Sequence, residues 1–211
     1  KNIIMKYVSI DIETTGLDSE KNSILSIGAI IEDTSKKLSF DDIPKFNTII
    51  PQHEISGSPR AIVMNEKIIR HISTYLEGTN EEKQELIDNG GYQFLSKDDV
   101  IRELYRFICL HLDIPNCEVI NTQTKPVTIN VAGKNFSGFD KLFLEKLPWW
   151  KKLIRVRSRV IDPAVLFCDF NTDETLPSLT TCKERGGIDG IVTHDAIDDA
   201  WDVIELLRKK Y

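Results

Sequence analysis

The chain has 211 residues, of which 41% are apolar and 28% charged, and its formal net charge is -6. This length and composition suit one globular domain, or at most two small ones. Four cysteines without a CxxC pair favour reduced thiols over a disulfide framework or a zinc site. No apolar run reaches the roughly 20 residues that cross a bilayer, and no secretory leader pattern is present. We therefore expect an intracellular, cytoplasmic protein without a membrane partner.

The first half of the chain predicts three strands followed by helices. Runs rich in β-branched residues indicate the strands, and Pro51 ends the third of them. Apolar residues at helical spacing indicate the helices, and the acidic stretch 77–91 predicts a short helix with a surface loop. The expected strands span residues 3–12, 23–31 and 45–50, and the expected helices span residues 59–76 and 97–112.

Strands and helices alternate in the second half. Pro148 ends a predicted helix, and Asp162 with Pro163 ends a predicted strand. Three strands followed by alternating strands and helices predict an α/β fold, in which helices cover the faces of one mixed sheet. The expected strands span residues 127–132 and 155–161, and the expected helices span residues 136–147, 176–184 and 195–211.

The charge is unevenly distributed. A net negative charge argues against a nucleic-acid partner, because phosphate binding usually requires a basic surface. The stretch 141–159 is an exception, since it holds seven basic residues against one acid, Glu145. A basic stretch of this kind indicates either a phosphate-binding surface or simply a solvated edge of the domain.

Two carboxylates stand at the end of the first predicted strand. Strand side chains alternate between faces, so Asp11 and Glu13 point the same way, while Ile10 and Ile12 point into a core. Two adjacent carboxylates repel each other unless a cation lies between them, and hard cations such as Mg²⁺ or Mn²⁺ prefer such oxygen ligands. The alternative is a strand end that reaches solvent.

A third acid, Asp140, falls within an apolar stripe of the predicted helix 136–147. Phe136, Phe143 and Leu144 share that stripe at helical spacing. An ionised group on a buried stripe is costly unless it is paired, hydrogen-bonded or bound to metal. The sequence therefore predicts either a metal ligand or a buried, capped aspartate at this position.

The last predicted helix separates its acids by phase. Asp199 lies beside the apolar seam, whereas the other charged residues share a face that we expect to be solvated. His194 precedes the helix, and beside a carboxylate cluster an imidazole suits proton transfer near neutral pH. The charged residues of the expected solvated face are Asp195, Asp198, Asp202, Glu205 and Lys209.

Three segments together resemble a known family. "DIETTGL" at 11–17, "NFSGFDKLFL" at 135–144 and "HDAIDDA" at 194–200 are similar to the three Exo motifs of the DEDDh exonucleases. That family includes RNase T, oligoribonuclease, the proofreading subunit of the bacterial replicative polymerase and the animal three-prime repair exonucleases. The resemblance extends from residue 7 to about residue 207. It implies a ribonuclease H-like fold, with a five-stranded mixed sheet flanked by helices and an antiparallel second strand, in one exonuclease domain over residues 1–211.

The resemblance also implies an activity, which is removal of nucleotides from the 3' end of DNA or RNA with release of 5'-mononucleotides. Two Mg²⁺ or Mn²⁺ ions would serve this hydrolysis. Asp11 would bridge both ions, Glu13 and Asp199 would hold the nucleophile side, and Asp140 the second ion. His194, five residues before Asp199, would be the general base. The implied partner is the 3' end of a single-stranded nucleic acid.

The resemblance further implies substrate contacts after the first strand. Thr14, Thr15 and Gly16 would hold the terminal nucleotide through backbone groups, and Gly16 suits close approach because it has no side chain. Leu17 would wedge against the last bases, with ordinary core packing as the alternative. The segment "GSPRAIVMNEKI" at 57–68 resembles the substrate-side loop of the family. In it, Asn65 stands where several family members carry histidine, and Arg60 where some carry an acid, which leaves the nucleotide contacts of this segment open.

Two other functions stay open at this point. One is a nucleic-acid- or protein-binding module that has the same fold but has lost activity, although all five motif residues are present. The other is a proofreading subunit, for which a polymerase, or a second copy of the chain, would be the partner. DNA and RNA substrates differ at the sugar 2' position, which the motifs do not encode.

Overall fold

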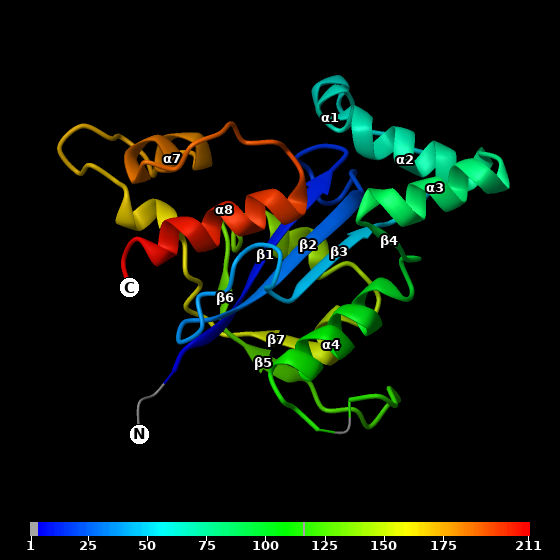
Figure 1. The fold of residues 1–211 in the computed structure, drawn as a ribbon, viewed down its shortest axis with the longest axis horizontal. Coiled ribbons are helices and arrows are strands. Elements are labelled where there is room, and N and C mark those ends of the chain that lie inside the picture. The colour runs from blue at the N-terminus through cyan, green and yellow to red at the C-terminus, as the bar shows by residue number, and fades with distance from the viewer. Residues whose placement is uncertain (1–3, 116) are drawn as a thin grey trace.

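The centre of the fold is a five-stranded sheet with the strand order β4-β3-β2-β1-β6. The structure is a computed structural model that describes residues 4–115 and 117–211. β2 runs antiparallel to both of its neighbours, whereas β1 with β6 and β3 with β4 are parallel. This confirms the predicted α/β fold with a mixed five-stranded sheet, flanked by helices (Figure 1). The strands are β1 (Lys6–Thr14), β2 (Ile24–Asp33), β3 (Lys45–Ile49), β4 (Gln93–Phe94) and β6 (Val131–Ala132).

One predicted strand, residues 127–132, is divided into two. β5 (Val127–Ile129) pairs with β7 (Ile154–Val156) in a separate two-stranded sheet, and β6 pairs with β1. Asn130 lies at the junction, where its carbonyl accepts the amide of Val8 at 2.9 Å. The expected strand 155–161 is also shorter than predicted, because it ends at Val156 and returns to the sheet only as a bridge from Ile161.

The helices differ from the predictions mainly at their boundaries. The expected helix 59–76 is divided at Asn65, whose side-chain amide donates to the carbonyls of Thr14 and Ala61, both at 3.2 Å. The acidic stretch forms a full helix, α3, which begins with a capping box between Thr79 and Glu82. The helices are α1 (Pro59–Met64), α2 (Glu66–Glu77), α3 (Asn80–Gly90), α4 (Val100–His111), α5 (Asp140–Leu144), α6 (Trp150–Leu153), the 3-10 helix η1 (Pro163–Leu166), α7 (Leu179–Gly186) and α8 (Ala196–Arg208).

The two faces of the sheet carry different helices. Val8, Ile10 and Ile12 of β1 belong to the larger core cluster, which includes buried residues of α4 and α6. Tyr7 lies on the opposite face, in a cluster with apolar residues of α8. The predicted alternation along β1 is therefore confirmed, and Asp11 is on the strand face toward α8. Among the described residues, no helix is both long and apolar enough to cross a membrane.

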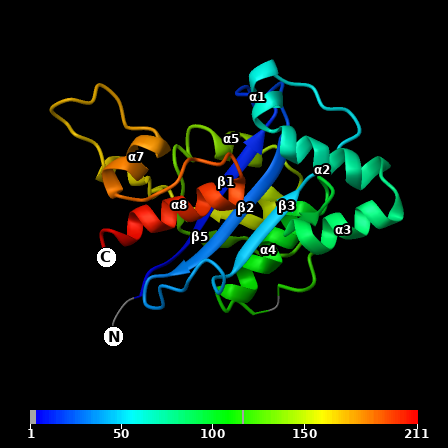
Figure 2. The ribbon, with the colours of Figure 1, turned by 45° about the horizontal axis from the view of Figure 1, so that its top comes forward.

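The first turn of α8 lies directly on the sheet. A Cβ atom at Gly28 of β2 would come within 2.3 Å of the Ala196 carbonyl carbon and 2.5 Å of the Ile197 amide nitrogen. One turn further along, the hydroxyl of Ser9 in β1 donates to the carbonyl of Ala200 at 2.7 Å. These contacts fix the beginning of α8 at the end of β1, and α1 lies at the same edge of the sheet (Figures 1 and 2).

The face of α8 that we expected to be solvated is partly covered. Asp202 is buried, because Lys183 of α7 packs over it with an ammonium-to-carboxylate distance of 2.6 Å. The side chain of Asp195 is only 13% exposed. The prediction of a solvated stripe is therefore wrong at these two positions, since helical phase identifies a face but not the segments that cover it.

Candidate active site

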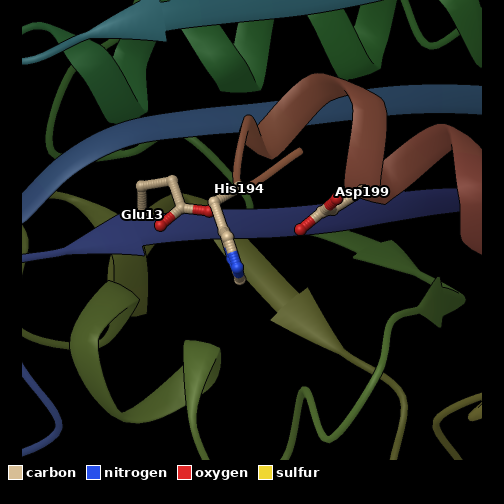
Figure 3. Close-up of side chains that lie close together, drawn as sticks. All are labelled: Glu13, His194 and Asp199. Atoms are coloured by element: carbon tan, nitrogen blue, oxygen red, sulfur yellow. The ribbon is translucent and has the colours of Figure 1, made fainter. Parts of the chain in front are cut away.

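Three side chains from two distant parts of the sequence meet near the end of β1. Glu13 comes from β1, His194 from the turn before α8 and Asp199 from the first turns of α8 (Figure 3). One ligand atom from each lies within 4.8 Å of the other two, so these three residues could hold a metal ion. Glu13 and Asp199 are buried, whereas His194 is exposed, so the group has a buried floor and an open side.

The other two predicted ligands border this group. Asp140, the first residue of α5, is 3% exposed, and one of its carboxylate oxygens accepts the amide of Ile12 at 3.1 Å. Because Ile12 stands between Asp11 and Glu13, this hydrogen bond places Asp140 beside both. Asp11 is partly exposed and interacts electrostatically with the carboxyls of Asp140, Asp199 and Glu13. The structure thus brings the five predicted residues together near the C-terminal end of β1.

Burial and mutual repulsion weaken the acidity of these groups. Burial raises the pKa of Glu13 to about 7. It raises the pKa of Asp140 to about 8 and that of Asp199 to about 8, and the charge of Glu13 adds to both. The pKa of Asp11 is raised well above its ordinary value, first by burial and then by the neighbouring carboxylates. Four carboxyls of this kind favour a bound cation, which would relieve their repulsion.

A buried carboxylate oxygen without a hydrogen-bond partner indicates whether these residues suit a metal ion. The Oδ1 atom of Asp199 is buried and has no hydrogen-bond partner among the described residues. A buried carboxylate oxygen normally has a partner, since leaving it unpaired is costly. Carboxylate oxygens beside an imidazole nitrogen are suitable ligands for a divalent cation. The donor set therefore fits a metal site.

The turn that carries His194 has an unusual backbone. His194 has a φ angle of 55°, in the left-handed region that residues other than glycine adopt uncommonly. The next residue, Asp195, is the N-cap of α8, and its side chain accepts the amide of Ile197 at 3.4 Å. Its carbonyl accepts the amide of Asp199 at 3.0 Å. The position of the imidazole and that of the helix turn that carries Asp199 thus depend on the same residue.

A pocket of about 410 Å³ adjoins the cluster and contains most of the predicted substrate residues. Thr14, Gly16, Leu17 and Asn65 line it, whereas Thr15 does not. Thr15 is fully buried, with its amide donating to the carbonyl of Ser23 and its carbonyl accepting the amide of Ser58. The lining residues are Ile12, Glu13, Thr14, Gly16, Leu17, Ser58, Arg60, Ala61, Met64, Asn65 and Phe139.

The structure excludes core packing as the role of Leu17. Its side chain is 86% exposed beside the pocket, so it does not belong to the core. Asn65 is 3% exposed, and its amide nitrogen is used to tie α1 to β1. Its Oδ1 atom is buried without a partner among the described residues, which leaves one polar atom in the pocket wall for a ligand.

Ser58, Met64 and Phe139 also line the pocket, although none of them was named as a substrate contact from the sequence. Phe139 directly precedes Asp140 in the second motif. Ser58 and Met64 belong to the segment 57–68, which resembles the substrate-side loop of the family. They reach the pocket because α1 lies against the turn after β1, where the amide of Ser58 donates to the carbonyl of Thr15 at 2.8 Å.

Comparison with known proteins gives one match. A family model, RNase_T, described as an exonuclease family, matches residues 8–88, which contain most of β1, all pocket-lining residues except Phe139, and α3 up to residue 88. A comparison with curated proteins finds no match. An exonuclease acts on nucleic acid, so this match supports a nuclease. The family match to residues 8–88, the mixed sheet and the acidic cluster beside His194 support an assignment to the DEDDh-type exonuclease family.

Proposed function

We propose that the chain is a metal-dependent 3'-5' exonuclease that hydrolyses single-stranded DNA or RNA and releases 5'-mononucleotides. The observation that carries this proposal is the convergence of Glu13, His194 and Asp199 within 4.8 Å, with a buried, unpartnered oxygen on Asp199. The neighbouring pocket of about 410 Å³ adds room for a terminal nucleotide. The direction of digestion comes from the similarity of the three motifs to those of the DEDDh exonucleases.

Asp11, Glu13, Asp140 and Asp199 would hold Mg²⁺ or Mn²⁺ in this proposal. Two bound ions would supply charge neutralisation for the phosphate, the attacking oxygen and the leaving oxygen. Asp140 is oriented for this role by the hydrogen bond from Ile12. His194 stands on the open side of the cluster, where its ring accepts the proton of the attacking water and can return it to solvent.

The pocket residues would position the end of the strand. Thr14 and Gly16 lie at its edge next to Glu13, and Leu17 projects from the same turn with 86% of its surface exposed. An exposed apolar side chain at the mouth of a pocket can pack against a nucleobase, since every base has an apolar face. Thr15 supports this turn from below rather than contacting the substrate.

The test is digestion of matched DNA and RNA oligonucleotides of one sequence with Mg²⁺ or Mn²⁺. Each oligonucleotide is labelled at the 5' end in one reaction and at the 3' end in another. A 3'-5' exonuclease shortens the 5'-labelled strand step by step and releases the 3' label at once as a mononucleotide. Release of the 5' label first would reverse the proposed direction.

An Asp140→Asn variant is the control for the site, and addition of EDTA is the control for the metal. If the variant cuts as fast as the parent, the proposed ligands are wrong. If the parent cuts neither DNA nor RNA with either ion, the chain is a binding module on this fold. Two further measurements test the two proposed partners. Binding to a polymerase tests the first, and the mass of the protein in solution tests whether a second copy of the chain is the partner.

A further inference from the structure

The turn that carries His194 is held from outside by a carboxylate contact. The Oδ2 atom of Asp195 accepts a short hydrogen bond from the hydroxyl of Tyr92. The ammonium of Lys67 lies 3.5 Å from the same oxygen. The other carboxylate oxygen accepts the amide of Ile197, so both oxygens have partners. Both carboxylate oxygens of Asp195 are therefore held in place, one residue after His194.

Tyr92 is a rigid anchor for this contact. It stands between α3 and β4, is 7% exposed and belongs to a buried cluster with Leu25 and Ile72. Its ring meets the ring of His71 edge to face, with 5.4 Å between the centroids. Burial and the charge of Asp195 raise the pKa of Tyr92, so its hydroxyl stays protonated and donates.

The backbone of His194 requires such an anchor. Its φ angle of 55° lies in a region that persists in residues other than glycine only where the surrounding structure holds it. His194 itself is exposed, so its own side chain does not supply that support. The supporting contacts act through the next residue, because Asp195 is bound to Tyr92 and also caps α8.

We propose that Tyr92 and Asp195 are positioning residues, which hold the turn at 193–195 so that the His194 ring stays within reach of Glu13 and Asp199. This inference rests on the proposed function, in which His194 accepts a proton. It makes the layer of α2, α3 and β4 part of the active centre, because Tyr92 and Lys67 come from that layer. A purely structural Tyr92 is the competing explanation.

The first test is Tyr92→Phe, which removes only the hydroxyl. We expect kcat on a short oligonucleotide at saturating Mg²⁺ to fall about 10- to 100-fold, as when outer hydrogen-bond partners of a catalytic site are lost. KM should change little, because the pocket beside Leu17 is untouched. The matched control is Tyr105→Phe on α4, outside the site, which loses a 3.2 Å hydrogen bond to the Lys125 carbonyl and should retain the parent kcat.

A double-mutant cycle separates positioning from general support. If Tyr92 acts through His194, adding Tyr92→Phe to a His194→Ala variant causes no further loss of kcat. A further 10-fold loss in that background would show that Tyr92 acts by another route, and would overturn the proposal. The Asp195→Asn variant supplies a rescue test, since an amide oxygen still accepts from Tyr92. It should keep more activity than Asp195→Ala.

A readout without activity keeps the inference separate from the proposed function. The ring resonance of His194 can be assigned by NMR from its loss in His194→Ala. We expect it to shift or broaden in Tyr92→Phe and to stay unchanged in Tyr105→Phe. An unchanged His194 resonance overturns the inference even if the parent is a nuclease. If the parent cuts nothing, the proposed function fails, and the same resonance still decides whether Tyr92 positions the turn.

Discussion

The four carboxyls at the end of β1 are held in an environment that resists their ionisation. Glu13 and Asp199 are less than a tenth exposed, and Asp140 is 3% exposed. The pKa values of these three groups, about 7 to about 8, lie far above the ordinary carboxyl value of about 4, and the pKa of Asp11 is also raised. At neutral pH the free protein therefore retains protons here that a bound cation must displace.

This linkage predicts how pH affects metal binding and stability. The folded-state pKa values exceed the unfolded ones, so the free protein loses the stability contributed by these groups as pH rises from about 4 to about 8. Metal binding needs the ionised carboxylates, so Mg²⁺ affinity should rise over the same window and level off above about pH 8. Thermal unfolding with and without MgCl2 should give a larger increase in Tm at pH 8 than at pH 6. An equal increase at both values would contradict it.

The Asp140→Asn substitution tests the same cluster by activity. The amide keeps an oxygen for the hydrogen bond from Ile12 but removes one negative charge. We expect a loss of at least about 100-fold in kcat/KM, since even outer partners of metal ligands cost 10- to 100-fold. The Tm of the metal-free protein near neutral pH should not fall, because Asn is uncharged like the protonated Asp140 and keeps the acceptor for Ile12. A large drop in Tm would instead indicate that Asp140 is mainly structural.

At the scale of elements, the site depends on how closely α8 approaches β2. Gly28 permits this approach, since a Cβ there would overlap the backbone of Ala196 and Ile197 rather than a side chain that can move. The same turn of α8 positions His194 and Asp199. Small displacements of α8 should therefore affect the chemistry before they affect the rest of the fold.

Gly28→Ala should shift α8 away from the sheet. We expect a loss of about 1–3 kcal/mol in the free energy of unfolding, which is typical of overpacking, together with reduced activity. Gly90→Ala is the matched control, because the nearest side-chain atoms to a Cβ there are 3.5 Å away or more, an ordinary contact. Urea unfolding of both variants gives the comparison. Equal stability of Gly28→Ala and the parent would show that α8 has room to move.

At the scale of the whole molecule, the net charge favours binding of short rather than long nucleic-acid strands. Without the four site carboxylates, the formal charge of -6 becomes -2. Lys141 and Lys146, in the basic stretch 141–159, already pair with Glu145 and Glu20. The molecule therefore offers little net positive charge to a long polyanion.

We accordingly predict modest affinity for long nucleic acids and a shallow dependence on salt. Binding of the Asp140→Asn variant to labelled single strands of increasing length, at several salt concentrations, measures this without digestion. The slope of log K against log[salt] should be well below that of a protein making 6–10 phosphate contacts. A slope in that range would show that the stretch 141–159 is a nucleic-acid surface after all.

Much of the site could be predicted because its signals are local. The alternation along β1 assigns Asp11 and Glu13 to one face, and helical phase marks Asp140 and Asp199 as buried, as the structure confirms. Which segment packs against a given face of a helix is not determined by the local sequence. Asp202 was expected in solvent because nothing near it in sequence indicates that Lys183 of α7 covers it.

Short elements and long-range contacts account for the other differences. β4 has two residues, too few to show a periodicity, and β5 is separated from β6 only because β5 pairs with β7. The pocket walls at Ser58 and Met64 likewise depend on where α1 comes to rest. The residue types and their periodicities were enough to predict the α/β fold and which of these acids share a strand face or lie on a buried stripe. Their joint role as metal ligands came from the resemblance to the three Exo motifs and stays a prediction. Which segments meet, and therefore how Tyr92 reaches Asp195, follows from packing between residues about 100 positions apart, which no local pattern encodes.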